Sequence, residues 1–399
     1  MKTGSRGEGG AALTSTETSQ RGDRLLAIDI LRGFIMALMA LDHTRDFVLG
    51  FSPDPTDLQT TTPALFATRW ITHICAPGFL LLAGISAYLH GRRAGGWALS
   101  GFLASRGAIL IALEITIITF AWAPDSSRSF ILLQVIWAIG WAMLLLSLLL
   151  HLGPNAVGLI GAAVILFHPL IGPEVLAALG APDWLYKILL GEGAIRTGEG
   201  DTLLALYSIL PWAGAMLLGY GLGPLFERPA PRWRPALLAL GAASLIGFVL
   251  ARAFTTLGDP IPWTAAPDFA TSAMAFLNVE KYPPSPLYSA ATLSVSLLLL
   301  ALFSRMSGGF LANAAATLGR APLFFYILHL YALRIVGLAL AVLVWGADGV
   351  GPAPLKTTPE WPLWAVWAVW LVAMVALYFP TRWFAQLKAQ SAARWIRFF

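Results

Sequence analysis

Charged residues and cysteine are both scarce in this sequence. Only 12% of its 399 residues are Asp, Glu, Lys or Arg, and 57% are hydrophobic, whereas about 25% of a soluble domain is charged. This composition excludes an ordinary soluble enzyme and indicates a membrane protein. The one cysteine, Cys75, excludes an intramolecular disulfide and a cysteine-cluster metal site.

Several familiar signatures are also missing. Residues 1–23 lack the apolar core of a signal peptide, and their polar, mixed-charge sequence predicts a disordered cytoplasmic tail. There is no P-loop, GxSxG or HExxH motif, and the absence of an internal repeat counts against an inverted-repeat transporter. No histidine and carboxylate spacing fits a metal motif, so we predict no metal. We interpret the net charge of +5 as a signal of membrane topology, and we expect no nucleic-acid partner.

Apolar runs of membrane-spanning length recur along the chain. They predict an all-α, polytopic membrane helical bundle of about ten transmembrane helices. The bundle forms one domain at residues 24–384, and a cytoplasmic C-terminal tail follows at 385–399. The expected spans are 25–49, 65–90, 104–123, 129–151, 154–171, 203–225, 235–254, 285–304, 320–346 and 361–384.

Basic residues gather in the even-numbered connections, and the odd-numbered ones are acidic or balanced. The positive-inside rule therefore places both termini in the cytoplasm. Two long connections on the outer side, 172–202 and 255–284, contain several aromatic residues. We expect short helices there that cover an outer cavity.

The first predicted span, RLLAIDILRGFIMALMALDHTRDF, carries more ionisable residues than an anchor needs. Spacings of three and four place a set of its residues on one stripe of a helix. Ionisable groups inside a span usually face a cavity or a partner, so the stripe predicts a path about 16 Å long from its arginine to its histidine. The alternative interpretation is that these charged residues lie at the membrane interface, where their side chains snorkel to water. The stripe comprises Asp29, Arg32, Met36, Met39, His43 and Asp46.

His43 is the predicted general base, because histidine titrates near neutral pH. Either Asp42 or Asp46 could stabilise its imidazolium, and Asp46 is the better local partner, since the adjacent Asp42 points about 100° away. His73, in the second span, is expected at the depth of His43 and is its rival. The alternative role of His73 is to bond a backbone carbonyl freed by Pro77.

Two further polar residues lie inside predicted spans. Glu114 lies in the third span, and we expect a cationic partner for it, with Arg32, Arg69 and Arg106 as the options. His329 lies about half-way across the ninth span. It has no partner nearby in the sequence, so we place it behind the site.

The residues expected to bind substrate lie toward the outer face. Gln134 and Trp137 have an alternative role in helix packing, and Lys281 has one in capping the aromatic belt. The residues in this set are Arg69, Gln134, Trp137, Lys281 and Tyr282.

The first span resembles that of the bacterial relatives of heparan-alpha-glucosaminide N-acetyltransferase, in the group that also contains acyltransferase family 3. The likeness continues in order over residues 24–335, in FATRWITHICAPGFLLLAGISAYL, QVIWAIG, PWAGAMLLGYGLG, FLNVEKYPP and GRAPLFFYILHL. The family's DxxRG feature corresponds to residues 29–33, and the first-span histidine of acyltransferase family 3 corresponds to His43. The animal enzymes have asparagine at that position and an essential histidine in the next outer loop. Residues 50–62 contain no histidine, so His43 or His73 takes that role.

The resemblance implies a membrane enzyme that moves an acetyl or other short acyl group from cytoplasmic acyl-CoA to a sugar or glycan-like acceptor outside. The expected location is a bacterial inner membrane. Expected partners are acetyl-CoA or another acyl-CoA, a glycan or small-molecule acceptor, and membrane lipids; a homodimer stays open. Direct transfer and a transient acyl-histidine both stay open. The alternative is a proton-coupled transporter or flippase for a small or lipid-linked substrate. Cations on the inner side would hold the CoA phosphates: Arg32, Arg92, Arg93 and Arg106.

Overall fold

A computed structural model describes most of the chain, with side chains from Leu26 onward. Among the described residues, eight helices are long and apolar enough to cross a membrane. The predicted all-α membrane bundle is therefore confirmed. The described residues are 8–49, 54–122, 130–196, 202–254, 258–306, 308–346, 361–391, 393 and 396.

The principal helices follow the order of the predicted spans. The second span is one continuous segment from Pro63 to Ala94, which contains α2 (Pro63–Trp70) and α3 (Cys75–Ala94). The third continues from α4 (Gly96–Leu113) through a π-helical turn at Glu114–Ile118 into α5 (Thr119–Trp122). The other principal helices are α1 (Glu8–Leu49), α6 (Val135–Leu149), α7 (Pro154–Phe167), α10 (Ile209–Leu222), α11 (Ala230–Phe254), α13 (Pro286–Phe303), α15 (Pro322–Trp345) and α16 (Leu363–Gln390).

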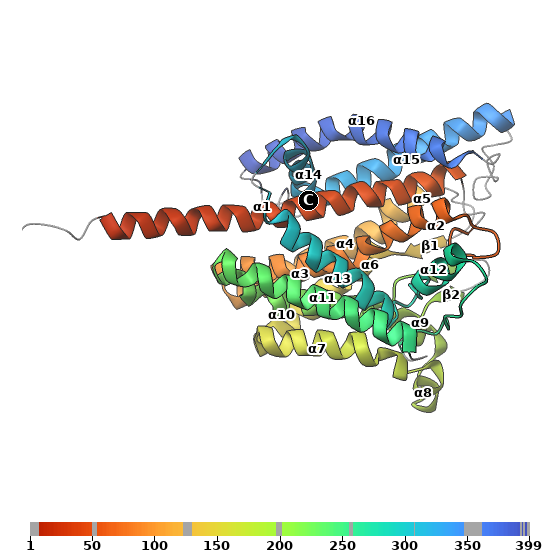
Figure 1. The fold of residues 1–399 in the computed structure, drawn as a ribbon, viewed down its shortest axis with the longest axis horizontal. Coiled ribbons are helices and arrows are strands. Elements are labelled where there is room, and N and C mark those ends of the chain that lie inside the picture. Colours follow the sequence, from red (N-terminus) through yellow and green to blue (C-terminus); the bar gives the residue numbers. More distant parts are fainter. Residues whose placement is uncertain are drawn as a thin grey trace, which may run out of the picture.

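Two of the ten predicted spans are not among the eight long apolar helices. The fifth is a shorter apolar helical segment, Pro154–Leu170. The first is α1, whose apolar part carries the charged stripe. This helix begins at Glu8, within the segment predicted to be a disordered tail, and its N-terminal part projects from the bundle (Figure 1). Residues 1–7 lie outside the described part of the chain.

A small sheet replaces the start of two predicted spans. Strand β1 (Phe130–Leu133) pairs in parallel with β3 (Thr202–Ala205), and β2 (Gly193–Arg196) pairs antiparallel with β3. The predicted fourth and sixth spans therefore start too early. Four apolar residues carry too little periodicity to distinguish a strand from a buried helix turn, and here pairing between distant segments decides.

Short elements gather at the end of the bundle where α1 finishes (Figure 1). We call it the loop-rich end; α2, the sheet and three short helices lie there. The prediction of short helices in the two long connections is confirmed. The sheet was not predicted. The three helices are α8 (Pro173–Ala178), α9 (Asp183–Leu189) and α12 (Phe269–Leu277).

The opposite end of the bundle, which we call the α14 end, carries the unpredicted helix α14 (Phe310–Arg320). The backbone of α14 touches that of α1 at two glycines. A Cβ atom on Gly33 would lie 1.7 Å from the Ala315 carbonyl oxygen, and one on Gly319 would lie 2.0 Å from the Asp29 carbonyl oxygen. Only glycine allows this approach, and it brings Arg32 to the C-terminal end of α14.

Candidate active site

The ring of His43 is hydrogen-bonded to a second histidine. Nδ1 of His43 lies 2.8 Å from Nε2 of His329 on α15. Nδ1 of His329 lies 2.9 Å from the carbonyl oxygen of Phe325, one turn earlier on that helix. The prediction that His329 lies behind the site is wrong, because the fold brings it into direct contact with the predicted base.

Aromatic rings enclose this pair. The ring of His43 meets Trp122 edge-on at 5.2 Å between centroids and Tyr326 at 6.2 Å. His329 has no exposed surface, while His43 is half-buried. Aromatic rings therefore shield the two histidines, and solvent reaches only part of His43, as in a site that excludes bulk water.

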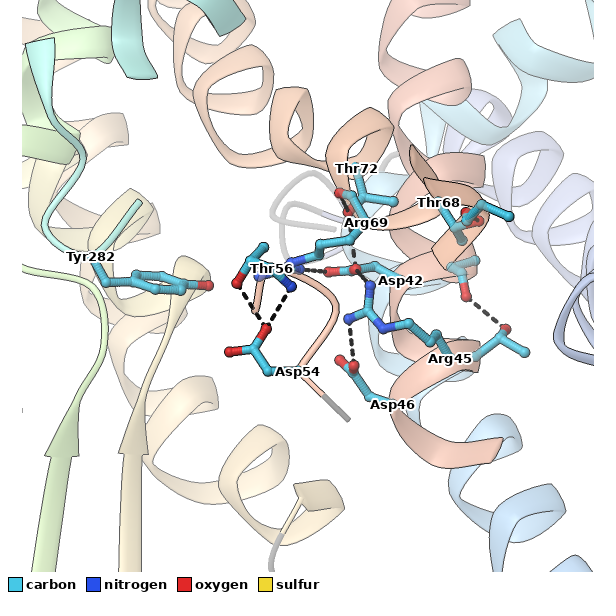
Figure 2. A network of polar contacts seen from close by, with 12 residues as sticks. Asp42, Arg45, Asp46, Asp54, Thr56, Thr68, Arg69, Thr72 and Tyr282 are labelled. Atoms are coloured by element: carbon cyan, nitrogen blue, oxygen red, sulfur yellow. Dashed lines mark hydrogen bonds and ion pairs between the residues drawn. The ribbon is translucent and has the colours of Figure 1, made fainter. Parts of the chain in front are cut away.

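Asp42 lies in a polar network at the loop-rich end (Figure 2). Arg45 contacts one of its carboxylate oxygens at 2.7 Å, and Arg69 of α2 contacts the other at 2.6 Å. The hydroxyl of Thr72 donates to the carboxylate of Asp42 at 2.9 Å. Because both oxygens are engaged by cations, Asp42 joins the second membrane segment to α1 and is not available as a base.

The carboxylate of Asp46 is also committed to an arginine. It lies 2.6 Å from Arg45, which thus bridges both acidic residues of this turn (Figure 2). The prediction that Asp46 is the local partner of His43 is wrong, because Nδ1 of His43 bonds His329 instead. Charge-assisted bonds to a guanidinium are stronger than a bond to a neutral imidazole, which explains why Arg45 takes the carboxylates.

Lys281 and Tyr282 stand beside each other near this network. The Lys281 ammonium lies 4.8 Å from the centroid of the Tyr282 ring, and the Tyr282 hydroxyl lies 3.4 Å from that of Tyr207. Figure 2 shows the Tyr282 ring directed toward the side of Arg69. Burial opposes ionisation of this phenol, but the positive charges of Lys281 and Arg69 outweigh it and lower the pKa of Tyr282.

A buried ion pair holds the segment that carries these two residues. Arg252 of α11 lies 3.6 Å from Asp259 and donates to four backbone carbonyls within residues 261–278. Asp259 in turn accepts from the amide of Glu280 and the hydroxyl of Ser285. Lys281 is therefore positioned by a rigid polar cluster and not by a loose loop.

His73, the predicted rival of His43, lies in different surroundings. It is 4% exposed, and its ring meets Tyr288 at 5.5 Å. The Tyr288 hydroxyl donates to the backbone carbonyl of His73 at 2.8 Å. Within the described part of the chain, Nδ1 of His73 has no hydrogen-bond partner. His43 does not bond His73 through Nδ1, because that nitrogen bonds His329.

Glu114 has a partner of a kind that the sequence analysis did not consider. Its Oε2 accepts from the backbone N–H of Trp137 at 2.9 Å, in the first turn of α6. The prediction of a cationic partner is wrong among the described residues: the positive end of a helix replaces it. Gln134 is the residue that precedes α6, and the Trp137 ring packs edge-on against Trp141 at 5.6 Å. These two predicted substrate residues thus flank a helix N-terminus.

Cations meet at the α14 end. Arg32 donates to Asp29 at 3.1 Å, to the Gly319 carbonyl at 3.0 Å and to the Ser86 hydroxyl at 2.9 Å. The positive charges of Arg106 and Lys388 act on this position as well. The buried Nε of Arg106 lacks a hydrogen-bond partner among the described residues.

The other two predicted cofactor arginines are exposed. Arg92, at the end of α3, forms an ion pair with Glu227, and Arg93 is exposed beside it. Ion pairs of this kind contribute little. The structure therefore brings Arg32 and Arg106 together and adds Lys388, which the sequence analysis did not single out because it lies in the predicted C-terminal tail.

The space between the two ends of the stripe is filled. Met36 and Met39 are 0% and 5% exposed and belong to the main apolar core. A path along this face of α1 requires these two side chains to move, which methionine does more readily than a branched residue. Within the residues that the structure describes, no group of three His, Cys, Asp or Glu side chains is placed to hold a metal ion.

Comparison with known protein families gives a match that covers part of the site. The model of a family described as heparan-alpha-glucosaminide N-acetyltransferase, catalytic, matches residues 24–253. This region covers more than half of the chain and includes His43, His73 and Glu114, but it ends before Lys281 and His329. No curated protein matches the chain.

Proposed function

Because the chain belongs to the heparan-alpha-glucosaminide N-acetyltransferase family, we propose that it transfers an acetyl or other short acyl group from cytoplasmic acyl-CoA to a sugar or glycan-like acceptor across the membrane. The family makes it a membrane transferase. The acyl-CoA donor, the acceptor class and the side on which each binds are the proposal.

The observation that carries the proposal is the environment of His43. Its Nδ1 is hydrogen-bonded to His329, and among the described residues no group bonds its Nε2. A half-buried histidine with one nitrogen engaged and the other open can accept a proton from an acceptor hydroxyl or amine. The adjoining Trp122 and Tyr326 rings restrict water, which would otherwise compete for the acyl group.

The reaction balances with His43 as the proton carrier. Nε2 of His43 takes the proton from the acceptor as the acceptor oxygen or nitrogen attacks the thioester carbonyl carbon. The C–S bond then breaks, and the departing thiolate takes the proton from His43, so that CoA leaves as a thiol. The positive charges of Lys281 and Arg69, which act on the ring of His43, are proposed to stabilise the negative charge that develops on the carbonyl oxygen.

Acyl-CoA binding is proposed for the α14 end. Arg32, Arg106 and Lys388 place three positive charges there with Asp29 as the neighbouring acid. Phosphate groups bind such clusters through charge-assisted hydrogen bonds, and the partnerless Nε of Arg106 is a donor for one. Arg92 and Arg93 would contribute at the exposed edge.

The direct test is incubation of the purified protein with labelled acetyl-CoA and fractionated envelope glycans and lipids. We expect free thiol to appear only when an acceptor is present, with the label on that acceptor. If no fraction made the release of free thiol depend on an acceptor, the proposed enzymatic function would be refuted. Movement of a substrate across liposomes without acyl-CoA would instead support the transporter alternative.

Sidedness needs a separate test. In a Cys75→Ser background, Leu179→Cys places a thiol at the loop-rich end and Arg228→Cys places one at the other end of the bundle. Leu179 is 77% exposed and Arg228 is also exposed. We expect a membrane-impermeant thiol reagent to label the first from outside the cell and the second only after lysis. The opposite labelling would reverse the proposed direction of transfer.

A further inference from the structure

The hydrogen bonds of the two histidines determine where their protons lie. The Phe325 carbonyl oxygen can only accept a hydrogen bond, so Nδ1 of His329 must carry a hydrogen and donate it. In a neutral imidazole the other nitrogen, Nε2, then holds a lone pair. Since that Nε2 lies 2.8 Å from Nδ1 of His43, Nδ1 of His43 must be the donor. The lone pair of His43 therefore lies on Nε2.

The reverse arrangement requires a buried positive charge. If His329 were protonated at both nitrogens, His43 would accept through Nδ1 and carry its hydrogen on Nε2, where it could not act as a base. His329 is 0% exposed, and its ring contacts the rings of Phe325 and Tyr326 at 5.2 Å and 5.5 Å between centroids. Among the described residues no carboxylate pairs with it. An unpaired charge in such surroundings is costly, so the neutral ring is favoured.

We propose that His329 is a positioning residue that holds His43 in the tautomer with the lone pair on Nε2. A neutral imidazole thus stands where a carboxylate stands in a hydrolase triad. What His43 then does rests on the function proposed above, but the tautomer itself does not.

This arrangement has a consequence for proton return. A carboxylate would stabilise the imidazolium of His43 with a full negative charge, whereas His329 offers only a lone pair and a dipole. The proton taken up by Nε2 of His43 is therefore held less firmly and passes to the leaving thiolate. His329 keeps its own proton on Nδ1 throughout, so its protonation is unchanged at the end of each turnover.

The test is nitrogen NMR of the full-length protein in nanodiscs, with histidine labelled by 15N. The signals of His43 are identified by their loss in His43→Asn. We expect a protonated Nδ1 and an unprotonated Nε2 in the parent. In His329→Phe the acceptor is gone, and His43 should shift toward the tautomer protonated on Nε2, which free imidazole side chains prefer. In His329→Gln the side-chain carbonyl can replace the acceptor, so the parental tautomer should remain.

Turnover provides the second readout. His329→Phe should lower kcat on the order of 100-fold at an unchanged KM for acyl-CoA, because the wrong tautomer removes the base, and His329→Gln should recover most of it. His168→Phe is the matched control: His168 is buried and bonds the Val164 carbonyl at 3.0 Å in the same one-turn geometry, and we expect parental kcat.

Each outcome decides something. A parent His43 protonated on Nε2, or an unchanged His43 spectrum in His329→Phe, overturns the inference whatever the activity. If His329→Phe does not fold, the parent spectrum and His329→Gln still decide. If the tautomer is as expected but no acceptor-dependent acyl transfer occurs, the proposed function fails and the assignment of His329 stands.

Discussion

Two histidines lie in the first two membrane segments, and their surroundings differ. His43 is half-buried and hydrogen-bonded to another imidazole. His73 is 4% exposed, faces the ring of Tyr288, and has an Nδ1 without a partner among the described residues. A general base needs an oriented ring and access to substrate, and these conditions are met at His43.

Electrostatics alone does not separate the two residues. The charges of Asp42, Arg69 and Lys281 act on both rings. What differs is the hydrogen bond that assigns a tautomer to His43, and this bond comes from α15, far away in the sequence. Two histidines with similar neighbouring charges are therefore not equivalent.

The largest effect is expected from removing the proposed general base. His43→Asn keeps a similar polar shape but no basic nitrogen, so turnover should fall about 100-fold or more while the KM for acyl-CoA changes little. His73→Gln, made in parallel, should retain most activity. The measurement is acyl-CoA turnover in liposomes, on variants that are monodisperse in detergent. An active His43→Asn together with an inactive His73→Gln would move the base to the second segment.

The polar network beside both histidines should matter chiefly for stability. Asp42→Asn leaves Arg69 without its counter-charge, and breaking a buried pair in this way costs about 3 kcal/mol of unfolding free energy. Denaturant unfolding in detergent measures it.

The matched double variant sharpens that test. Asp42→Asn combined with Arg69→Met removes both charges and should recover part of the loss, while Arg45 keeps Asp46 as its partner. Asp54→Asn, an exposed carboxylate, should change stability by about 0.5 kcal/mol or less. A double variant no more stable than Asp42→Asn would show that the pair is not what holds α2 to α1.

Changes at the α14 end should act on binding and not on the chemical step. Arg106→Met or Lys388→Met removes a charge proposed to contact phosphate, so the apparent KM for acyl-CoA should rise about tenfold with a smaller change in kcat. Arg305→Met, which removes an exposed charge that is not part of the proposed phosphate site, serves as the comparison. An equal rise in all three variants would indicate a general electrostatic attraction and no defined phosphate site.

The smallest effect is expected at Tyr282. The positive charge of Lys281 contributes to the lowered pKa of this phenol. Lys281→Met removes a charge that favours the phenolate, so the pKa of Tyr282 should rise. Ultraviolet titration of the tyrosine absorbance, with Tyr282→Phe subtracted to isolate this ring among the nine tyrosines, measures the change. A pKa unaffected by Lys281→Met would assign the effect to Arg69.

Much of the architecture was predictable because it depends on local composition. Apolar runs of spanning length identified the helices, and the spacing of Asp29, Arg32 and His43 on one stripe holds because α1 is a continuous helix. The blocks that resemble the acetyltransferase family agree with the family match as far as PWAGAMLLGYGLG, and the two later blocks lie beyond the matched residues 24–253. The starts of the fourth and sixth spans were missed because short apolar runs paired as strands β1 and β3.

The all-α bundle, the family and the ionisable residues in the first span can be recognised without a structure, since hydrophobicity and helical period are properties of neighbouring residues. Which of those residues meet depends on the packing of the helices. His329 reaches His43, Arg69 reaches Asp42, and the N-terminus of α6 reaches Glu114. These contacts join different segments, 286, 27 and 23 residues apart respectively, and their partners depend on how the helices pack side by side, which no local spacing encodes.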